Sequence, residues 1–162
     1  RSSIEMVGLD YNEVKDKSPF DLSGGQKRRV AIAGVIVTRP KILILDEPAA
    51  GLDPLGKKEI CALLHKLHEE WCRTVIIVSH DMDEIAENCT RAVVVSDGRA
   101  VACDTPSNLF SGGASMRALG LDVPLTSVIC EELSRFDINI NCNCTVKDFT
   151  DKVLEVYGGK NA

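Results

Sequence analysis

The sequence lacks an apolar run long enough to cross a membrane, and it lacks a concentrated basic patch. Its longest uncharged apolar stretch, Val30 to Val37, is short in a chain of 162 residues, because a spanning helix needs about 20 apolar residues. The formal net charge is −5, with 19 Lys and Arg against 24 Asp and Glu. Proteins hold nucleic acid mainly through clustered cations, so the composition argues against a nucleic-acid partner.

The seven cysteines lack paired spacing, since no C-x-x-C occurs among them. Zinc sites show such pairs, and small secreted disulfide scaffolds space their cysteines densely. We therefore expect reduced, mostly buried thiols. The alternative is a metal site formed by Cys142 and Cys144 together with Cys130.

A complete phosphate-binding loop is also absent. The stretch Gly51–Lys58 reads GLDPLGKK, in which Lys58 stands where G-x-x-x-x-G-K-[ST] requires a hydroxyl. Pro54 has no N–H to offer a phosphate, and Asp53 would place a carboxylate beside it. The same residues instead predict the start of a helix, with Asp53 at the N-cap and Pro54 at the first helical position.

Strands and helices alternate along the first hundred residues, which predicts an α/β fold. Ile42–Leu45 and Thr74–Ser79 are apolar runs, typical of parallel strands that are buried on both faces, and the helix expected over Pro54–Trp71 connects them. Asp97–Gly98 predicts a hairpin turn. The other expected elements are a helix end at Ser2–Leu9, a polar loop at Asp10–Ser18, helices at Ser23–Val37 and Met82–Asn88, hairpin strands at Ala92–Ser96 and Arg99–Cys103, and short helices at Ser107–Phe110, Ser115–Leu119, Leu125–Phe136 and Val146–Tyr157.

One candidate anion site is the pentapeptide LSGGQ at residues 22–26. Ser23 and Gln26 have the spacing of a capping box. Gly24 and Gly25 would leave backbone N–H groups open at the positive end of the helix dipole, where anions bind. A plain capping box without a ligand is the alternative interpretation.

A second candidate site lies at the carboxyl ends of the two strands, where open α/β sheets bind ligands. Asp46 is suited to hold Mg²⁺ through water, and Glu47 is suited to polarise an attacking water molecule. If the strands are parallel neighbours, His80 shares one crevice with Glu47 and is a candidate contact for a γ-phosphate. The alternative is that the two acids merely face solvent.

The ordered motifs LSGGQ, KILILDEP, AGLDP and VSHD resemble the second half of an ABC transporter ATPase, over about Ser18 to Val101. The resemblance implies a partial P-loop NTPase fold, ATP and Mg²⁺ as cofactors, and a head-to-tail dimer of ATPase subunits. By the same resemblance, Asp46 and Glu47 correspond to the acidic residues at the end of the Walker B strand, and His80 corresponds to the switch histidine. The residues implied to contact ATP across the dimer interface are Ser23, Gly24, Gly25 and Gln26, with Asp53 in a loop that crosses the same interface.

Within this family, SPFDLSGGQKRRVAIAGV and DEPAAGLDPLGKKEI resemble the energy-coupling factor branch, whose members drive import of vitamins or transition metals. That resemblance implies integral membrane partner subunits and a peripheral position on the cytoplasmic face of the membrane. It also implies two domains: residues 1–104 as the C-terminal half of the ATPase domain, and residues 105–162 as a small helical extension.

Nothing before Ser18 matches a phosphate-binding loop. We therefore expect the chain to be the C-terminal portion of a longer ATPase, and to lack normal Mg-ATP affinity and hydrolysis by itself. Two alternatives are a catalytically silent partner that lends its signature motif to another subunit, and a soluble ABC-type ATPase that acts on DNA or ribosomes.

Overall fold

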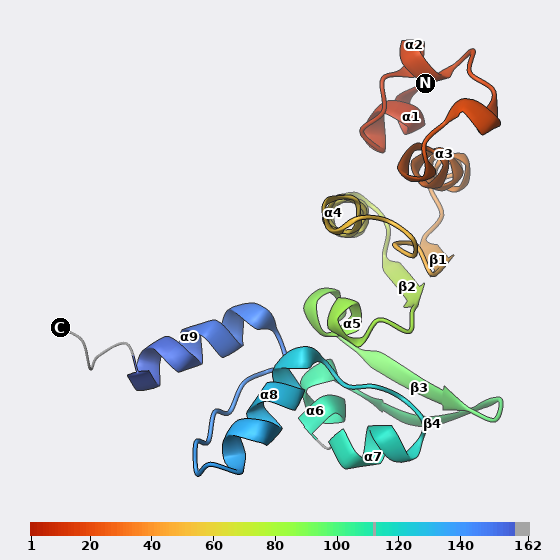
Figure 1. Ribbon diagram of the computed structural model, residues 1–162. Helices are drawn as coiled ribbons and strands as arrows, with labels where there is room; N and C mark the ends of the chain where they lie inside the picture. Colours follow the sequence, from red (N-terminus) through yellow and green to blue (C-terminus); the bar gives the residue numbers. More distant parts are fainter. Residues whose placement is uncertain (112, 158–162) are drawn as a thin grey trace. The chain divides into compact units, whose positions relative to one another are not determined.

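The computed structural model describes residues 1–111 and 113–157, and the chain divides into two compact units (Figure 1). The first unit is Arg1–Val78, and the second begins at Ser79. The expected boundary between residues 104 and 105 concerns the domains of a whole ATPase and stays a prediction.

The first unit contains two long helices and a parallel strand pair. Its elements are α1 (Ser2–Met6), α2 (Tyr11–Val14), the 3-10 helix η1 (Pro19–Asp21), α3 (Gly24–Ile36), β1 (Ile42–Asp46), α4 (Pro54–Glu70) and β2 (Thr74–Val78). The expected helices and strands are confirmed to within a few residues. The polar loop expected at Asp10–Ser18 is wrong in part. Asp10 accepts a hydrogen bond from Asn12 N at 2.8 Å and so caps the short helix α2.

β1 and β2 pair in parallel, as predicted, and α4 is the crossover between them. In this register Leu43 lies opposite Val75, and Leu45 lies opposite Ile77. These four side chains share one face because side chains alternate along a strand. That face packs on the core formed with α3 and α4. The fully buried members of this core include Ile36, Leu43, Ile60 and Leu67.

The expectation that both faces of the strands are buried is wrong. Leu43 is 1% exposed, whereas its neighbour Ile44 is 65% exposed. The outward face carries four exposed apolar side chains: Ile42, Ile44, Ile76 and Val78. The physical reason is that, in the described part of the chain, this sheet has two strands and the helices of its core lie against one side.

The second unit begins with a helix and an antiparallel hairpin and continues as short helices. Its elements are α5 (Met82–Asn88), β3 (Ala92–Ser96), β4 (Arg99–Asp104), α6 (Pro106–Ser111), α7 (Gly113–Ala118), α8 (Leu125–Ser134) and α9 (Val146–Tyr157). The predicted hairpin is confirmed, with Ser96 opposite Arg99. Asp97 and Gly98 have φ values of 49° and 72°, as a turn with two left-handed residues requires.

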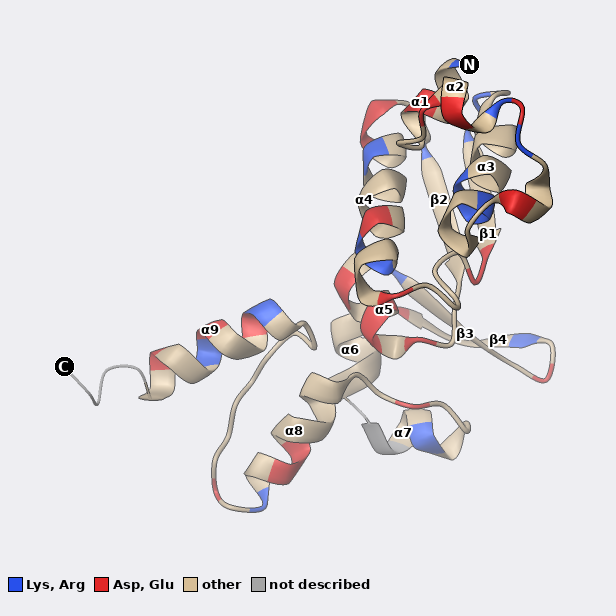
Figure 2. Ribbon diagram, turned by 45° about the horizontal axis from the view of Figure 1, so that its top comes forward, with Lys and Arg blue, Asp and Glu red and all other residues tan. Residues whose placement is uncertain are grey.

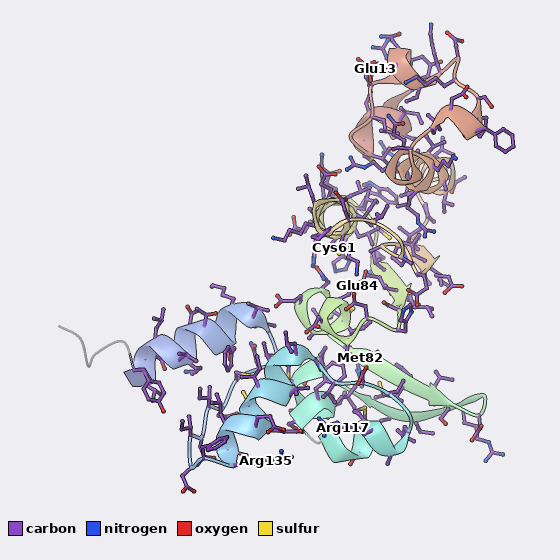
Figure 3. All side chains as sticks on the ribbon, in the orientation of Figure 1. Glu13, Cys61, Met82, Glu84, Arg117 and Arg135 are labelled. Atoms are coloured by element: carbon purple, nitrogen blue, oxygen red, sulfur yellow. The ribbon has the colours of Figure 1, made fainter. Side chains whose placement is uncertain are left out.

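Polar contacts connect the helices of the second unit to one another. Arg117 on α7 pairs with Glu131 on α8 at 2.7 Å (Arg117 is labelled in Figure 3). Asp83 accepts a hydrogen bond from Leu125 N at 3.0 Å, and Glu87 accepts one from Val146 N at 2.7 Å. The two carboxylates of α5 therefore hold the first residues of α8 and α9.

Charged residues of both signs are interspersed along α4 and α9 (Figure 2). Within the described ranges, no helix is both long and apolar enough to cross a membrane.

Candidate functional site

The LSGGQ residues form the N-terminus of α3, and the predicted capping box is present. Ser23 Oγ accepts a hydrogen bond from Gln26 N at 3.2 Å, and Gln26 Oε1 accepts one from Ser23 N at 3.0 Å. The Ser23 O–H proton and the Gln26 amide NH₂ are not used in these two bonds. Both groups therefore remain able to donate to a ligand.

Two glycine N–H groups lie at this helix start. The first four N–H groups of a helix have no partner within the helix, and the capping box accounts for that of Gln26. A Cβ atom built on Gly24 has no heavy atom within 4 Å. The backbone of Gly24 thus faces open space, and an anion can approach the helix terminus closely.

The structure brings this helix start beside the loop that follows β1. A Cβ atom built on Gly25 would lie 4.0 Å from Leu52 Cδ2, and Leu52 immediately precedes Asp53. Leu52 belongs to the AGLDP motif, but the motif alone did not predict a contact for its side chain. Its approach to Gly25 brings the AGLDP loop and the LSGGQ helix start together within one chain.

Asp46 is the last residue of β1 and Glu47 follows it, so both acids lie at the carboxyl end of the strand, as predicted. Asp46 is exposed and lies opposite Val78, on the outward face of the sheet. Glu47 N donates to Val78 O at 2.8 Å, which continues the ladder one residue beyond the strand. Glu47 has φ of 48°, a left-handed conformation that non-glycine residues seldom adopt and that is often found at functional sites. The sequence contained no signal for this conformation.

The stretch that resembles a phosphate loop is the start of α4. Asp53 Oδ1 accepts a hydrogen bond from Gly56 N at 2.9 Å, and Pro54 is the first residue of the helix. The prediction of a capped helix is therefore confirmed. Since the Asp53 carboxylate fills the space where a phosphate would bind the N–H groups, this helix terminus is not an anion site.

His80 follows β2 by two residues and belongs to the second unit. It is exposed and stands between two residues that fix the start of α5. Ser79 Oγ donates to Glu84 at 2.7 Å (Glu84 is labelled in Figure 3), and Asp81 Oδ1 accepts from Glu84 N at 3.1 Å. The expectation that His80 and Glu47 share a crevice stays a prediction.

No cluster of three His, Cys, Asp or Glu side chains suited to a metal ion occurs among the described residues, and this includes the three cysteines considered above. Mg²⁺ is normally held by one or two carboxylates completed by phosphate oxygens and water. A single exposed carboxylate such as Asp46 fits that mode of binding.

A hollow of about 490 Å³ lies between α1, α2 and the first turns of α3. Apolar side chains such as Ile4, Val14 and Val30 line it, and Lys15, Lys17 and Lys27 also contribute. Leu22 of the LSGGQ motif lines this hollow, whereas the candidate phosphate contacts Ser23, Gly24, Gly25 and Gln26 do not.

Comparison with known proteins gives the class of the chain. Residues 1–50 match the sequence model of the ABC transporter family. Together with the α3 terminus and the β1 end described above, this match identifies the chain as part of an ABC transporter ATP-binding domain.

Within this class, the chain is similar to ATP-binding proteins of energy-coupling factor transporters. It is 45% identical to EcfA2 of Clostridium perfringens over 162 residues, which is 99% of this chain and 57% of that protein. It is also 45% identical to EcfA2 of Clostridioides difficile, covering 99% of this chain and 56% of that protein. The chain therefore spans little more than half the length of these relatives.

Solved structures show the same fold. CbiO1 of Clostridium perfringens, described as part of the ABC transporter complex CbiONQ, aligns with a TM-score of 0.62 and 40% identity, over 80% of this chain and 51% of that one. The ATP-binding cassette MJ0796, a dimer bound to ADP and Pi, aligns with a TM-score of 0.57 and 32% identity, over 65% of this chain and 44% of that one. The α/β prediction is confirmed, since these neighbours are ABC ATPase domains with a parallel sheet and flanking helices.

Proposed function

We propose that the chain is part of an ATP-hydrolysing subunit of an energy-coupling factor importer for vitamins or transition metals. The whole protein would form a head-to-tail dimer with a second ATPase subunit. It would bind integral membrane subunits at the cytoplasmic face of the membrane. Support comes from the similarity to EcfA2 proteins over 99% of this chain and from a structural neighbour that is part of a transporter complex.

The observation that carries the proposal is the backbone geometry of Glu47. Its N–H continues the β1–β2 ladder, and its positive φ turns the chain away at once. The backbone of Glu47 is therefore held in a defined conformation immediately beyond the strand end, and its carboxylate extends from that position. A carboxylate placed there can accept a proton from an attacking water molecule. Asp46, one residue earlier, would hold Mg²⁺, which when bound neutralises charge on the phosphates.

The start of α3 is suited to a phosphate group that bears negative charge. The donors are the N–H groups of Gly24 and Gly25, the hydroxyl of Ser23 and the amide of Gln26, and none of these is consumed by the capping box. We infer that they bind the γ-phosphate of ATP held by the second subunit. Asp53, next to Leu52, would lie at the same interface, and His80 would contact the γ-phosphate from the strand end.

The test is Glu47→Gln in the full-length protein with its partner subunits. Loss of the general base should lower ATP turnover by at least about 100-fold, while nucleotide binding is retained because the amide is nearly isosteric. Glu13→Gln is the matched control, since Glu13 is exposed on α2 (Figure 3) and contributes to neither motif. Steady-state hydrolysis and equilibrium binding are measured on each variant.

Turnover near that of the wild type in Glu47→Gln would contradict the catalytic assignment. It would favour the silent-partner alternative, in which the signature residues act on another subunit's nucleotide. The 162-residue chain alone contains no complete phosphate loop, so a calorimetric titration with Mg-ATP should show no micromolar binding.

A further inference from the structure

Two of the seven cysteines lie in direct contact, and the proposed ATPase function uses neither. Cys130 is on α8, and Cys142 is in the segment of residues 135–145 that connects α8 to α9 (the α8–α9 segment). Their sulfur atoms are 3.4 Å apart. A disulfide bond is about 2.0 Å long, so the pair is a hydrogen-bonded dithiol. Both thiols are partly exposed and accessible to a small molecule.

Several contacts hold the α8–α9 segment against α8. Thr126 on α8 donates to Cys144 O at 2.7 Å, and Asn143 N donates to Asp148 on α9 at 2.7 Å. Ile140 is buried. The Cys142 backbone is thus fixed on both sides by packing and hydrogen bonds, so the thiol contact is part of the packed structure of the unit.

Cys144, the third cysteine nearby, is in a different environment. Its side chain is buried, and its sulfur accepts a hydrogen bond from the Ser127 hydroxyl at 3.2 Å. Burial raises the pKa of the Cys144 thiol, which lowers its reactivity at neutral pH. The structure therefore separates one contacting pair from a third, enclosed thiol.

We propose that Cys130 and Cys142 are a redox-active pair, which a small-molecule disulfide oxidises to an intramolecular disulfide that fastens the α8–α9 segment to α8. The proposal does not rest on the ATPase function. It replaces the metal interpretation of these cysteines, because none of the described residues complete a metal-ligand cluster with them.

The exchange proceeds in two balanced steps. The Cys142 thiolate attacks one sulfur of the small disulfide, forms a mixed disulfide and releases the first small thiol. Cys130 then attacks the Cys142 sulfur, and the second small thiolate leaves and takes up the Cys130 proton. The protein loses two electrons and two protons, and the small disulfide gains them as two thiols.

The environment of Cys130 suits it to the second step. Burial, and then the hydrogen bond with Cys142, raise the pKa of Cys130 to about 12, so its thiolate is scarce at neutral pH. Cys130 completes the bond because the 3.4 Å contact already places it beside the sulfur that it attacks.

The experiment incubates the native 162-residue chain in a defined mixture of oxidised and reduced glutathione, blocks the remaining thiols with N-ethylmaleimide and maps the disulfides. Arg135, the C-cap residue of α8 (Figure 3), stands between Cys130 and Cys142 in the sequence. Trypsin therefore places Cys130 in peptide 118–135 and both Cys142 and Cys144 in peptide 136–147, and fragmentation of the linked peptides at Asn143 shows which of the two cysteines is joined to Cys130. The expected result is a cross-link between these peptides that joins Cys130 to Cys142, leaves Cys144 alkylated, and removes two of the seven alkylatable thiols.

Cys142→Ser should abolish the cross-link, whereas Cys103→Ser, at an exposed thiol on β4, should retain it. Circular dichroism of the reduced variants checks that each one folds. Three results would overturn the proposal: no cross-link under conditions that oxidise a reference dithiol, a cross-link from Cys130 to Cys144, or the same mixture of pairings in the native and urea-unfolded chain.

Discussion

The two strand pairs of this molecule are both rich in apolar residues, but the register of each pair is determined by different interactions. β1 and β2 are joined through the whole of α4, and their register depends on the packing of one face against α3 and α4. β3 and β4 are joined by the two residues Asp97 and Gly98, and their register is set by that turn, with one irregularity between Val94 and Val95. The parallel pair therefore depends on long-range contacts, and the hairpin depends on local backbone geometry.

The comparison predicts that the parallel pair responds most strongly to changes in its buried face. Leu43→Ala should lower the free energy of unfolding by about 2–5 kcal/mol, because a fully buried leucine loses its packing and leaves a cavity. Ile44→Ala, one residue along, should cost about 1 kcal/mol or less, because that side chain is 65% exposed. Urea denaturation followed by the fluorescence of Trp71 reports on this unit.

Equal costs for these two substitutions would contradict the assignment of inward and outward faces. In the full-length protein, where we propose that more of the ATPase domain surrounds the sheet, the cost of Ile44→Ala should rise towards that of Leu43→Ala.

The next largest effect should come from the cap of the crossover helix. Asp53→Ala removes the acceptor for Gly56 N at the start of α4 and should cost about 1 kcal/mol. Asp53→Asn is the control, since asparagine caps helices nearly as well as aspartate. The same urea titration measures both variants. If Asp53→Asn lost as much stability as Asp53→Ala, the charge of Asp53 and not its role as a helix cap would be the cause.

The hairpin should be sensitive to its turn and insensitive to changes in the first unit. Gly98→Ala forces a Cβ into a backbone with φ of 72° and should cost about 1 kcal/mol. Asp97→Asn should be tolerated, since asparagine adopts positive φ readily. Amide hydrogen exchange in β3 and β4 is the measurement, and unchanged protection in Gly98→Ala would show that packing alone sets this register.

The last prediction concerns the second unit and is confined to alkaline pH. Burial raises the pKa of Cys130 from its ordinary value of 9.0 to about 12. The neutral thiol is thus favoured in the folded chain, and its stabilising contribution is complete below pH 9 and is lost as the pH rises from about 9 to 12. The free energy of unfolding, plotted against pH over this range, should fall more steeply for the wild type than for Cys130→Ser. Parallel curves would indicate that the thiol titrates normally.

The local features of the fold were predictable from the sequence. The Ser23–Gln26 capping box, the Asp53–Pro54 helix start and the Asp97–Gly98 turn each depend on residues within four positions of one another. Their physical causes are fully present in a short peptide. The parallel pairing was also predictable, because a helix between two apolar runs leaves few other topologies.

The burial of the sheet was not predictable in the same way. An all-apolar strand shows that both of its faces are suited to a core, but it does not show whether a partner covers each face. Ile44 and Leu43 are chemically alike, and only the tertiary structure separates them. The missed helix α2 is a different case, since the Asp10 cap was a local signal.

The candidate site was predictable in its residue types and not in its geometry. The motifs identified Ser23, Asp46 and Glu47. The left-handed backbone of Glu47 and the approach of Leu52 to Gly25 are products of folding, without a pattern in the sequence. The roles of the site residues in ATP hydrolysis remain proposals that the Glu47 variant tests.

A sheet of two strands has no central strand. In the described part of the chain, β1 and β2 each have one hydrogen-bonded neighbour, so the outer edge of each presents N–H and C=O groups beside exposed isoleucine and valine. Such edges readily pair with the edges of other molecules. Preparations of this chain should therefore self-associate as concentration rises, and the β1–β2 edges are the places where a lysine or proline would improve its solution behaviour.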